Sequence, residues 1–366
     1  MPDLADLCSR AVDGAGPGED VEAYASEGQR TQVRVRGGEV ESLTFADSRG
    51  LGVRVIDGKR VGYAYAADPG EDEVGELVRS ARESAGFAEP DQGNTLPVLG
   101  DVEAMPEIFR DAQSGVETSR KVSLALELER AAISVHPEVG KVESAVYGDS
   151  ISRVALASTK GGPLAYARTD SWAAVSALAE RDGETQTGFG LTLARETREL
   201  DWEEAARDAA VRAGRLLGGT KPRSERMAVI LDPVAAASFL GVLAGALSAE
   251  SVLKGRSLFA GRVGEEVAAG TVTLVDDGRL LDGPAVAPFD DEGVPTDRTE
   301  LIEDGFLRGF LHNTYTAARA GERSTGNAGR GGYRTVPGVA ASNLFLEPGE
   351  GTPADLLRQA GRCVYV

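Results

Sequence analysis

Residues 51–65 read LGVRVIDGKRVGYAY, and this stretch decides the fold class. Apolar side chains occupy every second position from Leu51 to Val55 and again from Val61 to Tyr65. Asp57-Gly58, between the two runs, is a typical two-residue hairpin turn. The stretch therefore predicts two antiparallel strands whose apolar face must be covered by other elements.

Similar alternation continues on both sides of this hairpin. Residues 33–35 and 40–45 predict two earlier strands joined at Gly37-Gly38, so the region is expected to form an antiparallel meander of at least four strands. Apolar residues at helical spacing predict covering helices, and Asp201 is the predicted N-cap of another helix. The predicted covering helices span 4–12, 71–85 and 119–135, and the later strands span 141–147, 151–158, 164–179 and 185–194.

The best domain boundary lies at residues 220–226, where mixed charges follow Gly218-Gly219. We therefore expect an α+β protein. Its N-terminal domain, 1–219, would be an antiparallel sheet with covering helices. Its C-terminal domain, 227–366, would be mainly β, opened by a strand and an apolar helix that begins at Asp232-Pro233. Because the chain ends within an apolar strand, we expect this second domain to be truncated.

Composition excludes several classes of function. The 366 residues carry a formal net charge of −19, which disfavours direct binding to nucleic acid or to an anionic membrane. The two cysteines, Cys8 and Cys363, cannot form a disulfide scaffold and favour a reducing compartment. The acidic N-terminus and the absence of a long apolar run predict a cytoplasmic protein.

Few residues are candidates for chemistry. There are only two histidines, His136 and His312, and no Gly-x-Ser-x-Gly motif. His312 is the better candidate for a site, although a structural role is the alternative. The acidic run Phe289–Gly293 could bind a hard cation or be an ordinary acid-rich surface turn. Gly326–Gly332 lacks the order of a phosphate-binding loop and is interpreted as a flexible loop.

Several motifs in the C-terminal half resemble the TldD/PmbA family. Residues 288–296 read PFDDEGVPT, residues 311–319 read LHNTYTAAR, and residues 324–328 read STGNA. The resemblance covers essentially the whole chain. It implies a family of zinc peptidases in which TldD-type chains carry HExxxH on a helix, with two histidine ligands and a glutamate base. The same family is normally longer at the C-terminus.

The segment of this chain that would match HExxxH carries no histidine. It consists of Ala244, Gly245, Ala246, Leu247, Ser248 and Ala249. The chain therefore resembles the TldE/PmbA type, which lacks the zinc motif and pairs with TldD. This resemblance implies no catalytic or metal-binding residue in this chain, with zinc expected only in a TldD-type partner.

The resemblance implies a non-catalytic subunit of a peptidase complex that processes or degrades small unfolded peptides. The alternative is a self-sufficient homodimeric scaffold that modulates DNA gyrase through protein partners. A third hypothesis is an enzyme that uses His312 with nearby acids. The candidates for a peptide groove or subunit interface are Gly245, Asp290, Asp291, Glu292, His312, Thr325, Gly326 and Asn327.

Overall fold

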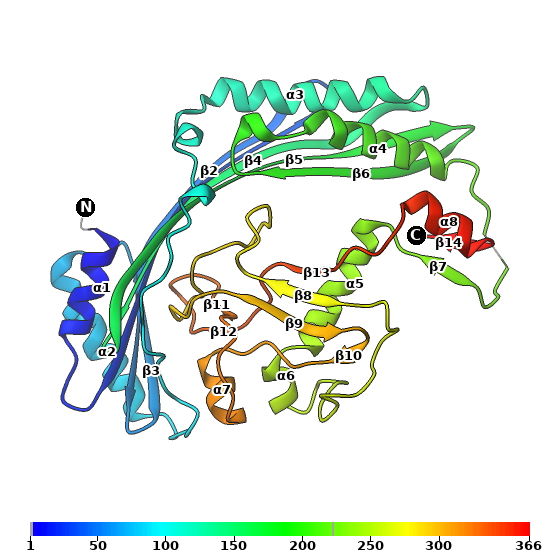
Figure 1. Ribbon diagram of the computed structural model, residues 1–366. Helices are drawn as coiled ribbons and strands as arrows, with labels where there is room; N and C mark the ends of the chain where they lie inside the picture. The colour runs from blue at the N-terminus through cyan, green and yellow to red at the C-terminus, as the bar shows by residue number, and fades with distance from the viewer. Residues whose placement is uncertain (1–2, 222) are drawn as a thin grey trace.

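The computed structural model describes residues 3–221 and 223–366. A long, strongly curved antiparallel sheet forms the N-terminal part, with strand order β3-β2-β1-β4-β5-β6 (Figure 1). Its strands are β1 (Asp20–Arg36), β2 (Glu39–Asp57), β3 (Arg60–Ala67), β4 (Val139–Ser158), β5 (Gly161–Arg181) and β6 (Glu184–Ala194). Because the strands are long and bent, the two ends of one sheet carry separate helical layers.

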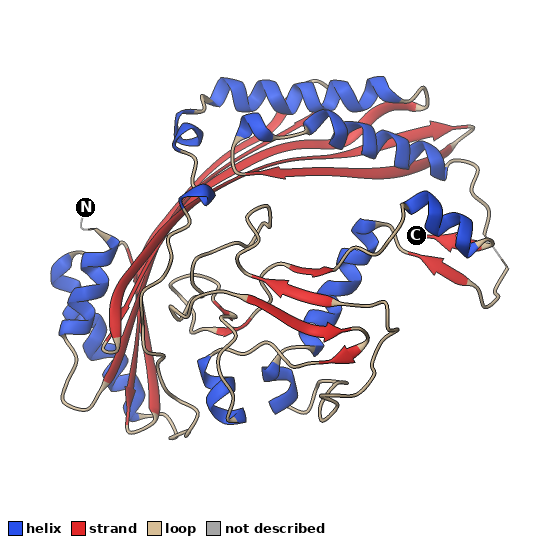
Figure 2. Ribbon diagram, viewed as in Figure 1, coloured by secondary structure: helices blue, strands red, loops and turns tan. Residues whose placement is uncertain are grey.

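Two helix pairs cover the convex face of this sheet (Figure 2). α1 (Leu4–Asp13) and α2 (Val74–Gly86) pack on one end, where Val21, Ala23 and Ala25 of β1 are buried. α3 (Thr118–Val135) and α4 (Trp202–Leu216) pack on the other end, above Val33 and Val35 of the same strand. Odd-numbered residues of β1 thus form both cores, as the period of a strand requires. The Asp201 side chain caps α4 as predicted, accepting a bond from the Glu204 N–H.

The predicted strand boundaries need correction. The stretch 33–35 is the end of the longer strand β1, and the meander predicted to have at least four strands has three, β1 to β3. The stretches 40–45 and 51–55 belong to one strand, β2, and the stretches 141–147 and 151–158 belong to β4. Pairing continues without a break where the sheet bends, for example at Gly28↔Ser48. The alternation stops there because no helix covers the bend, so its residues are polar or small without forming a turn.

The C-terminal part lies on the concave side of the large sheet (Figure 1). It contains a four-stranded sheet of order β10-β9-β8-β13, an antiparallel pair β11-β12 and a parallel pair β14-β7. Its strands are β7 (Ala228–Ile230), β8 (Leu274–Asp277), β9 (Arg298–Glu303), β10 (Phe306–Leu307), β11 (Ala328–Gly329), β12 (Gly338–Val339), β13 (Leu344–Leu346) and β14 (Cys363–Tyr365). Its helices are α5 (Pro233–Ala246), α6 (Ala249–Leu253), α7 (Thr314–Ala320) and α8 (Pro353–Ala360). Thr352 caps α8 as an N-cap residue.

The segment 244–249, which the sequence analysis compared with HExxxH, does not lie on a single helix. α5 ends at Ala246, and Ser248 caps the start of α6. The intervening backbone pairs with another segment instead, because Leu311 N–H donates to Leu247 and Ala249 N–H donates to Leu311. Within the described ranges, none of the helices is long and apolar enough to cross a membrane.

Candidate functional site

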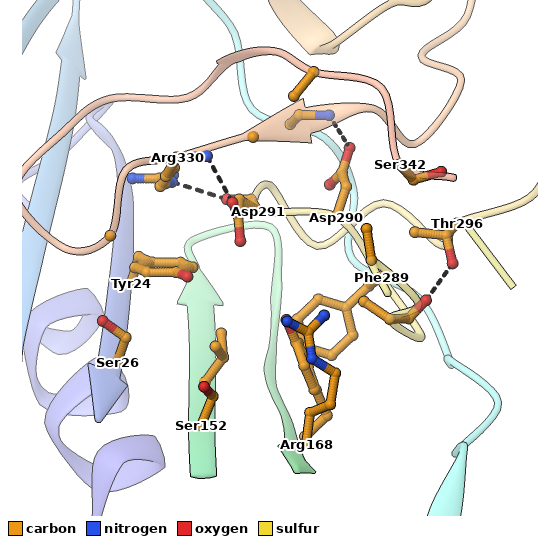
Figure 3. Close-up of a pocket in the computed structure, with 18 of the residues that line it drawn as sticks. Tyr24, Ser26, Ser152, Arg168, Phe289, Asp290, Asp291, Thr296, Arg330 and Ser342 are labelled. Carbon is orange, nitrogen blue, oxygen red and sulfur yellow. Dashed lines mark hydrogen bonds between the residues drawn. The ribbon is translucent and has the colours of Figure 1, made fainter. Parts of the chain in front are cut away.

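A cavity of about 490 Å³ lies between the concave face of the large sheet and the C-terminal part (Figure 3). The sheet supplies Ser26 and Gly28 from β1, Ser152 from β4 and Arg168 from β5. The opposite wall comes from two loops, one with Phe289, Asp290 and Asp291 and one with residues 326–330. Both loops carry motifs selected from the sequence.

Asp290 fastens these two loops together. Its Oδ1 accepts bonds from the N–H groups of Glu292 (2.9 Å) and Val294 (3.0 Å), and its Oδ2 accepts one from Ala328 (2.9 Å). Burial and the neighbouring Glu292 carboxylate raise the pKa of Asp290 to about 8, against the opposing effect of the three donors. At 6% exposed, Asp290 does not belong to a surface turn, so that interpretation of the acidic run was wrong.

Glu292 belongs to a buried ion cluster that joins the two parts of the chain. Its Oε1 accepts a bond from Arg54 of β2 (3.0 Å), and its Oε2 accepts one from the Thr314 N–H (2.8 Å). Arg54 also pairs with Glu22 of β1, and Glu22 pairs with Arg330. Burial alone would raise the pKa of Glu22, but the two guanidinium groups outweigh it and the net shift of its pKa is downward.

Asp291 extends this cluster to the cavity. Its Oδ2 accepts a bond from the Arg330 N–H (2.7 Å), and its backbone oxygen accepts one from Arg330 Nε (3.0 Å). Tyr24 lies on the same side of the cavity, and the Arg330 guanidinium lies 4.8 Å from the Tyr24 ring centroid. Burial raises the pKa of Asp291. The Arg330 side chain is fully buried and residues 328–329 form strand β11, so the segment 326–332 is not simply a loop as expected from the sequence.

The STGNA motif holds backbone in place. Thr325 Oγ1 accepts a bond from the His312 N–H (2.8 Å). Asn327 Nδ2 donates to Asp276 Oδ2 (2.7 Å). Gly326 has φ +72°, and a Cβ there would lie 2.5 Å from the Pro295 oxygen, so only glycine fits. These contacts give each of the three residues a structural role, and none of the roles requires catalysis.

His312 lies against a second cavity of about 750 Å³. It is 7% exposed, and burial lowers its pKa below the usual value. In the described part of the chain, nothing hydrogen-bonds to its Nδ1. The backbone pairing of Leu311 with residues 247–249 places His312 beside the segment compared with HExxxH.

Of the eight residues predicted from the sequence as groove or interface candidates, four lie together at the first cavity. Asp290, Asp291, Gly326 and Asn327 line the first cavity. Among the residues that the structure describes, the other four candidates do not line this cavity. They are Gly245, Glu292, His312 and Thr325. Sequence reasoning did not select Glu22, Arg54 or Arg330 as site residues. Arg54 alternates with Val53 and Val55 like a solvent-facing residue, and the only signal was that buried carboxylates need partners.

The residues of α5 do not fit a zinc ion. Ser238 is the one residue between Pro233 and Ala246 whose side chain contains oxygen, nitrogen or sulfur, whatever the alignment with HExxxH. Zinc needs imidazole, thiolate or carboxylate ligands. Elsewhere in the described residues, no group of three or more His, Cys, Asp or Glu side chains is arranged to hold a metal.

Comparison with known proteins identifies relatives of this chain. Models of the PmbA/TldA metallopeptidase family match domain 1 at residues 21–85, the central domain at 112–217 and the C-terminal domain at 224–366. Metalloprotease PmbA of Escherichia coli O157:H7 is 26% identical over 336 residues, covering 89% of this chain and 73% of that protein.

Two solved structures share the fold. A protein of Thermotoga maritima, described as a candidate modulator of a DNA gyrase, superposes with a TM-score of 0.90 at 25% identity. The alignment covers 99% of this chain and 82% of that one. TldE from Thermococcus kodakarensis has a TM-score of 0.87 at 22% identity, covering 98% and 81%, which shows likeness of fold. The chain belongs to the PmbA/TldD family of metallopeptidase-like proteins.

Proposed function

We propose that this chain is a TldE/PmbA-like, non-catalytic subunit of a metallopeptidase complex that processes small unfolded peptides. The observation that carries this proposal is the composition of residues 233–249, α5 and the segment compared with HExxxH, which offer no imidazole, thiolate or carboxylate to a zinc ion. A TldD-type partner would supply the zinc and the catalytic base. This chain would supply half of the chamber that receives the peptide.

The surface of α5 supports a partner subunit. Leu240, Leu243 and Ala246 pack on the C-terminal core. Phe239 and Val242, by contrast, are 55% and 75% exposed. A helix that is apolar on more than one side favours cover by a second chain over exposure to water. The helix is also the element that holds zinc in TldD-type chains according to the family resemblance, so a partner at this position would bring the two corresponding helices together.

The test compares the chain alone with the chain co-expressed with a TldD-type protein that carries HExxxH. We expect the chain alone to hold no stoichiometric zinc and to cleave no peptide. We expect the pair to co-elute in size-exclusion chromatography, with zinc and peptide hydrolysis present in the complex. Zinc near one per chain in the isolated protein, surviving dialysis against a weak chelator, would contradict the proposal.

If this chain does not pair with a TldD-type protein, the alternative function gains support. A stable homodimer that ignores every TldD-type chain would favour the alternative, a scaffold that modulates DNA gyrase through protein partners. The name of the Thermotoga relative supports keeping that alternative in the test. The chain's charge of −19 directs such an effect toward proteins and away from DNA itself.

A further inference from the structure

Four residues in one row form part of the floor of the cavity beneath Asp290 and Asp291. Ser48 of β2 lies opposite Gly28 of β1, Gly28 lies opposite Ser152 of β4, and Ser152 lies opposite Arg168 of β5. Directly opposed residues of antiparallel strands point to the same face. Gly28 leaves open space in this row, because a Cβ there would meet only Ser48 Oγ, at 3.7 Å.

The carboxylates that line the cavity already have donors. Glu27 pairs with Arg153 (3.1 Å) and Arg49 (3.4 Å). Asp290 accepts three backbone N–H groups, and Asp291 accepts the Arg330 N–H. The acidic side of the cavity is therefore largely satisfied within the protein.

The floor, in contrast, has donors to spare. Arg168 donates through Nε to Asp170 (2.9 Å) and through Nη1 to the Val286 oxygen (3.2 Å). Its Nη2 has no acceptor among the residues that the structure describes. Ser152 likewise makes no side-chain hydrogen bond within that set. Asp170 also pairs with Arg195, so two guanidinium groups share one carboxylate.

The unused guanidinium donor of Arg168 and the free hydroxyl of Ser152 suit an anionic acceptor. We propose that this cavity binds a carboxylate, and that Arg168 and Ser152 receive the C-terminal carboxylate of a short peptide (Figure 3). A volume of about 490 Å³ suits a ligand of a few residues. The carboxylate chemistry rests on the cavity alone, whereas the choice of a peptide rests on the proposed function.

The test measures binding to the isolated chain by titration calorimetry. The probes are tetra-alanine with a free C-terminus and the same peptide as its C-terminal amide. We expect amidation and Arg168→Gln each to weaken binding about tenfold or more, because each removes a charge-assisted bond. If the two groups meet, amidation has no further effect in Arg168→Gln.

Matched variants separate this contact from a general loss of charge. Arg153→Gln removes an equal charge at the same cavity, but from a guanidinium already paired with Glu27, and it should bind like the unchanged chain. Gly28→Val fills the open space in the floor and should abolish binding while the protein stays folded. Equal binding of acid and amide, or an equal loss in Arg153→Gln and Arg168→Gln, would overturn the proposal.

A third probe tests the source of the carboxylate. The C-terminal amide of Ala-Ala-Glu-Ala carries only a side-chain carboxylate. Binding of this peptide as tight as that of tetra-alanine, with the same dependence on Arg168, would overturn the assignment to the C-terminus. Because the titration uses the chain without a partner, normal peptide binding with no pairing to a TldD-type chain contradicts only the proposed function. Pairing without peptide binding contradicts only this inference.

Discussion

His312 is a histidine whose charged form the fold disfavours. Burial lowers its pKa below the usual value, so the folded state resists protonation more than the unfolded chain does. It therefore adds stability above its unfolded pKa, and that stability is lost as the pH falls through and below this value. We expect the unfolding free energy of the unchanged chain, relative to His312→Gln, to decrease from about pH 8 to about pH 5. Urea unfolding at both pH values measures this change, and a constant difference would contradict it.

Sequence reasoning found site residues that stand in local motifs, and it missed residues whose ion-pair partners are remote in the chain. Asp290, Asp291 and Asn327 stand in recognisable motifs, and all three line the cavity. Glu22 and Arg330 are buried together although they are 308 residues apart. Local alternation cannot distinguish a charge that faces water from a charge that faces a distant opposite charge. The same limit explains why a surface turn was one of the two interpretations of the acidic run.

At the scale of elements, glycines set how closely helices approach the edge strand β6. A Cβ at Gly190 would lie 1.9 Å from the Ala205 oxygen and 3.1 Å from the Ala209 nitrogen, both backbone atoms of α4. Because backbone cannot rotate away, Gly190→Ala must push the helix outward. We expect a loss of about 1–3 kcal/mol in the free energy of unfolding. Gly28→Ala is the control, and an equal effect of both changes in urea unfolding would refute this account.

Element type was easier to predict than element length. The helical stripes correctly gave α1, α2 and α3, because each buries one face on a sheet. β2 and β4 were each predicted as two strands. Apolar alternation indicates where a helical layer covers the sheet, whereas the strand pairing continues through the uncovered bend. Local sequence does not indicate where α5 ends, because the pairing of Leu247 and Ala249 with Leu311 depends on a segment remote in the chain.

The exposed side of α5 gives a second prediction at this scale. Gly245 is exposed, and a Cβ there would meet nothing within 4 Å, so Gly245→Glu should leave the isolated chain folded. In a paired complex the new carboxylate would be buried without a partner, which costs several kcal/mol. We expect co-elution with a TldD-type chain to weaken by orders of magnitude.

Gly75→Glu is the matched control for this change, because Gly75 is equally open on α2 at the convex face. Circular dichroism verifies that both variants fold. Undiminished pairing of Gly245→Glu would remove α5 from the interface. Weakened pairing in both variants would show an effect of charge alone.

At the scale of the whole molecule, a buried contact joins the large sheet to the C-terminal part. Tyr24 and Leu156 of the sheet pack with Phe289 and Tyr333 in a separate apolar cluster. The buried ions Glu22, Arg54, Glu292 and Arg330 lie at the same junction. The helical layers on the convex face form their own cores and include none of these residues. The junction should therefore respond to mutation separately from the layers.

Arg330→Gln tests this separation. Arg330 is fully buried, and removing its charge leaves Glu22 with Arg54 as its remaining ion-pair partner. Breaking a buried pair in this way costs about 3–5 kcal/mol, more than the loss of a surface ion pair. We expect faster hydrogen exchange in residues 324–332, while α3 and α4 keep their protection because their core is elsewhere.

Two companion variants make the result decisive. Arg330→Lys keeps the charge but loses the planar fork that reaches Glu22, the Asp291 backbone and the Tyr24 ring, so it should lie between the unchanged chain and Arg330→Gln. Arg334→Gln removes an exposed charge four residues away and should leave the exchange of 324–332 unchanged. Equal exchange in Arg330→Gln and Arg334→Gln would show that the ions do not hold the junction. Loss of protection in α3 and α4 together with 324–332 would show that the two parts unfold as one unit.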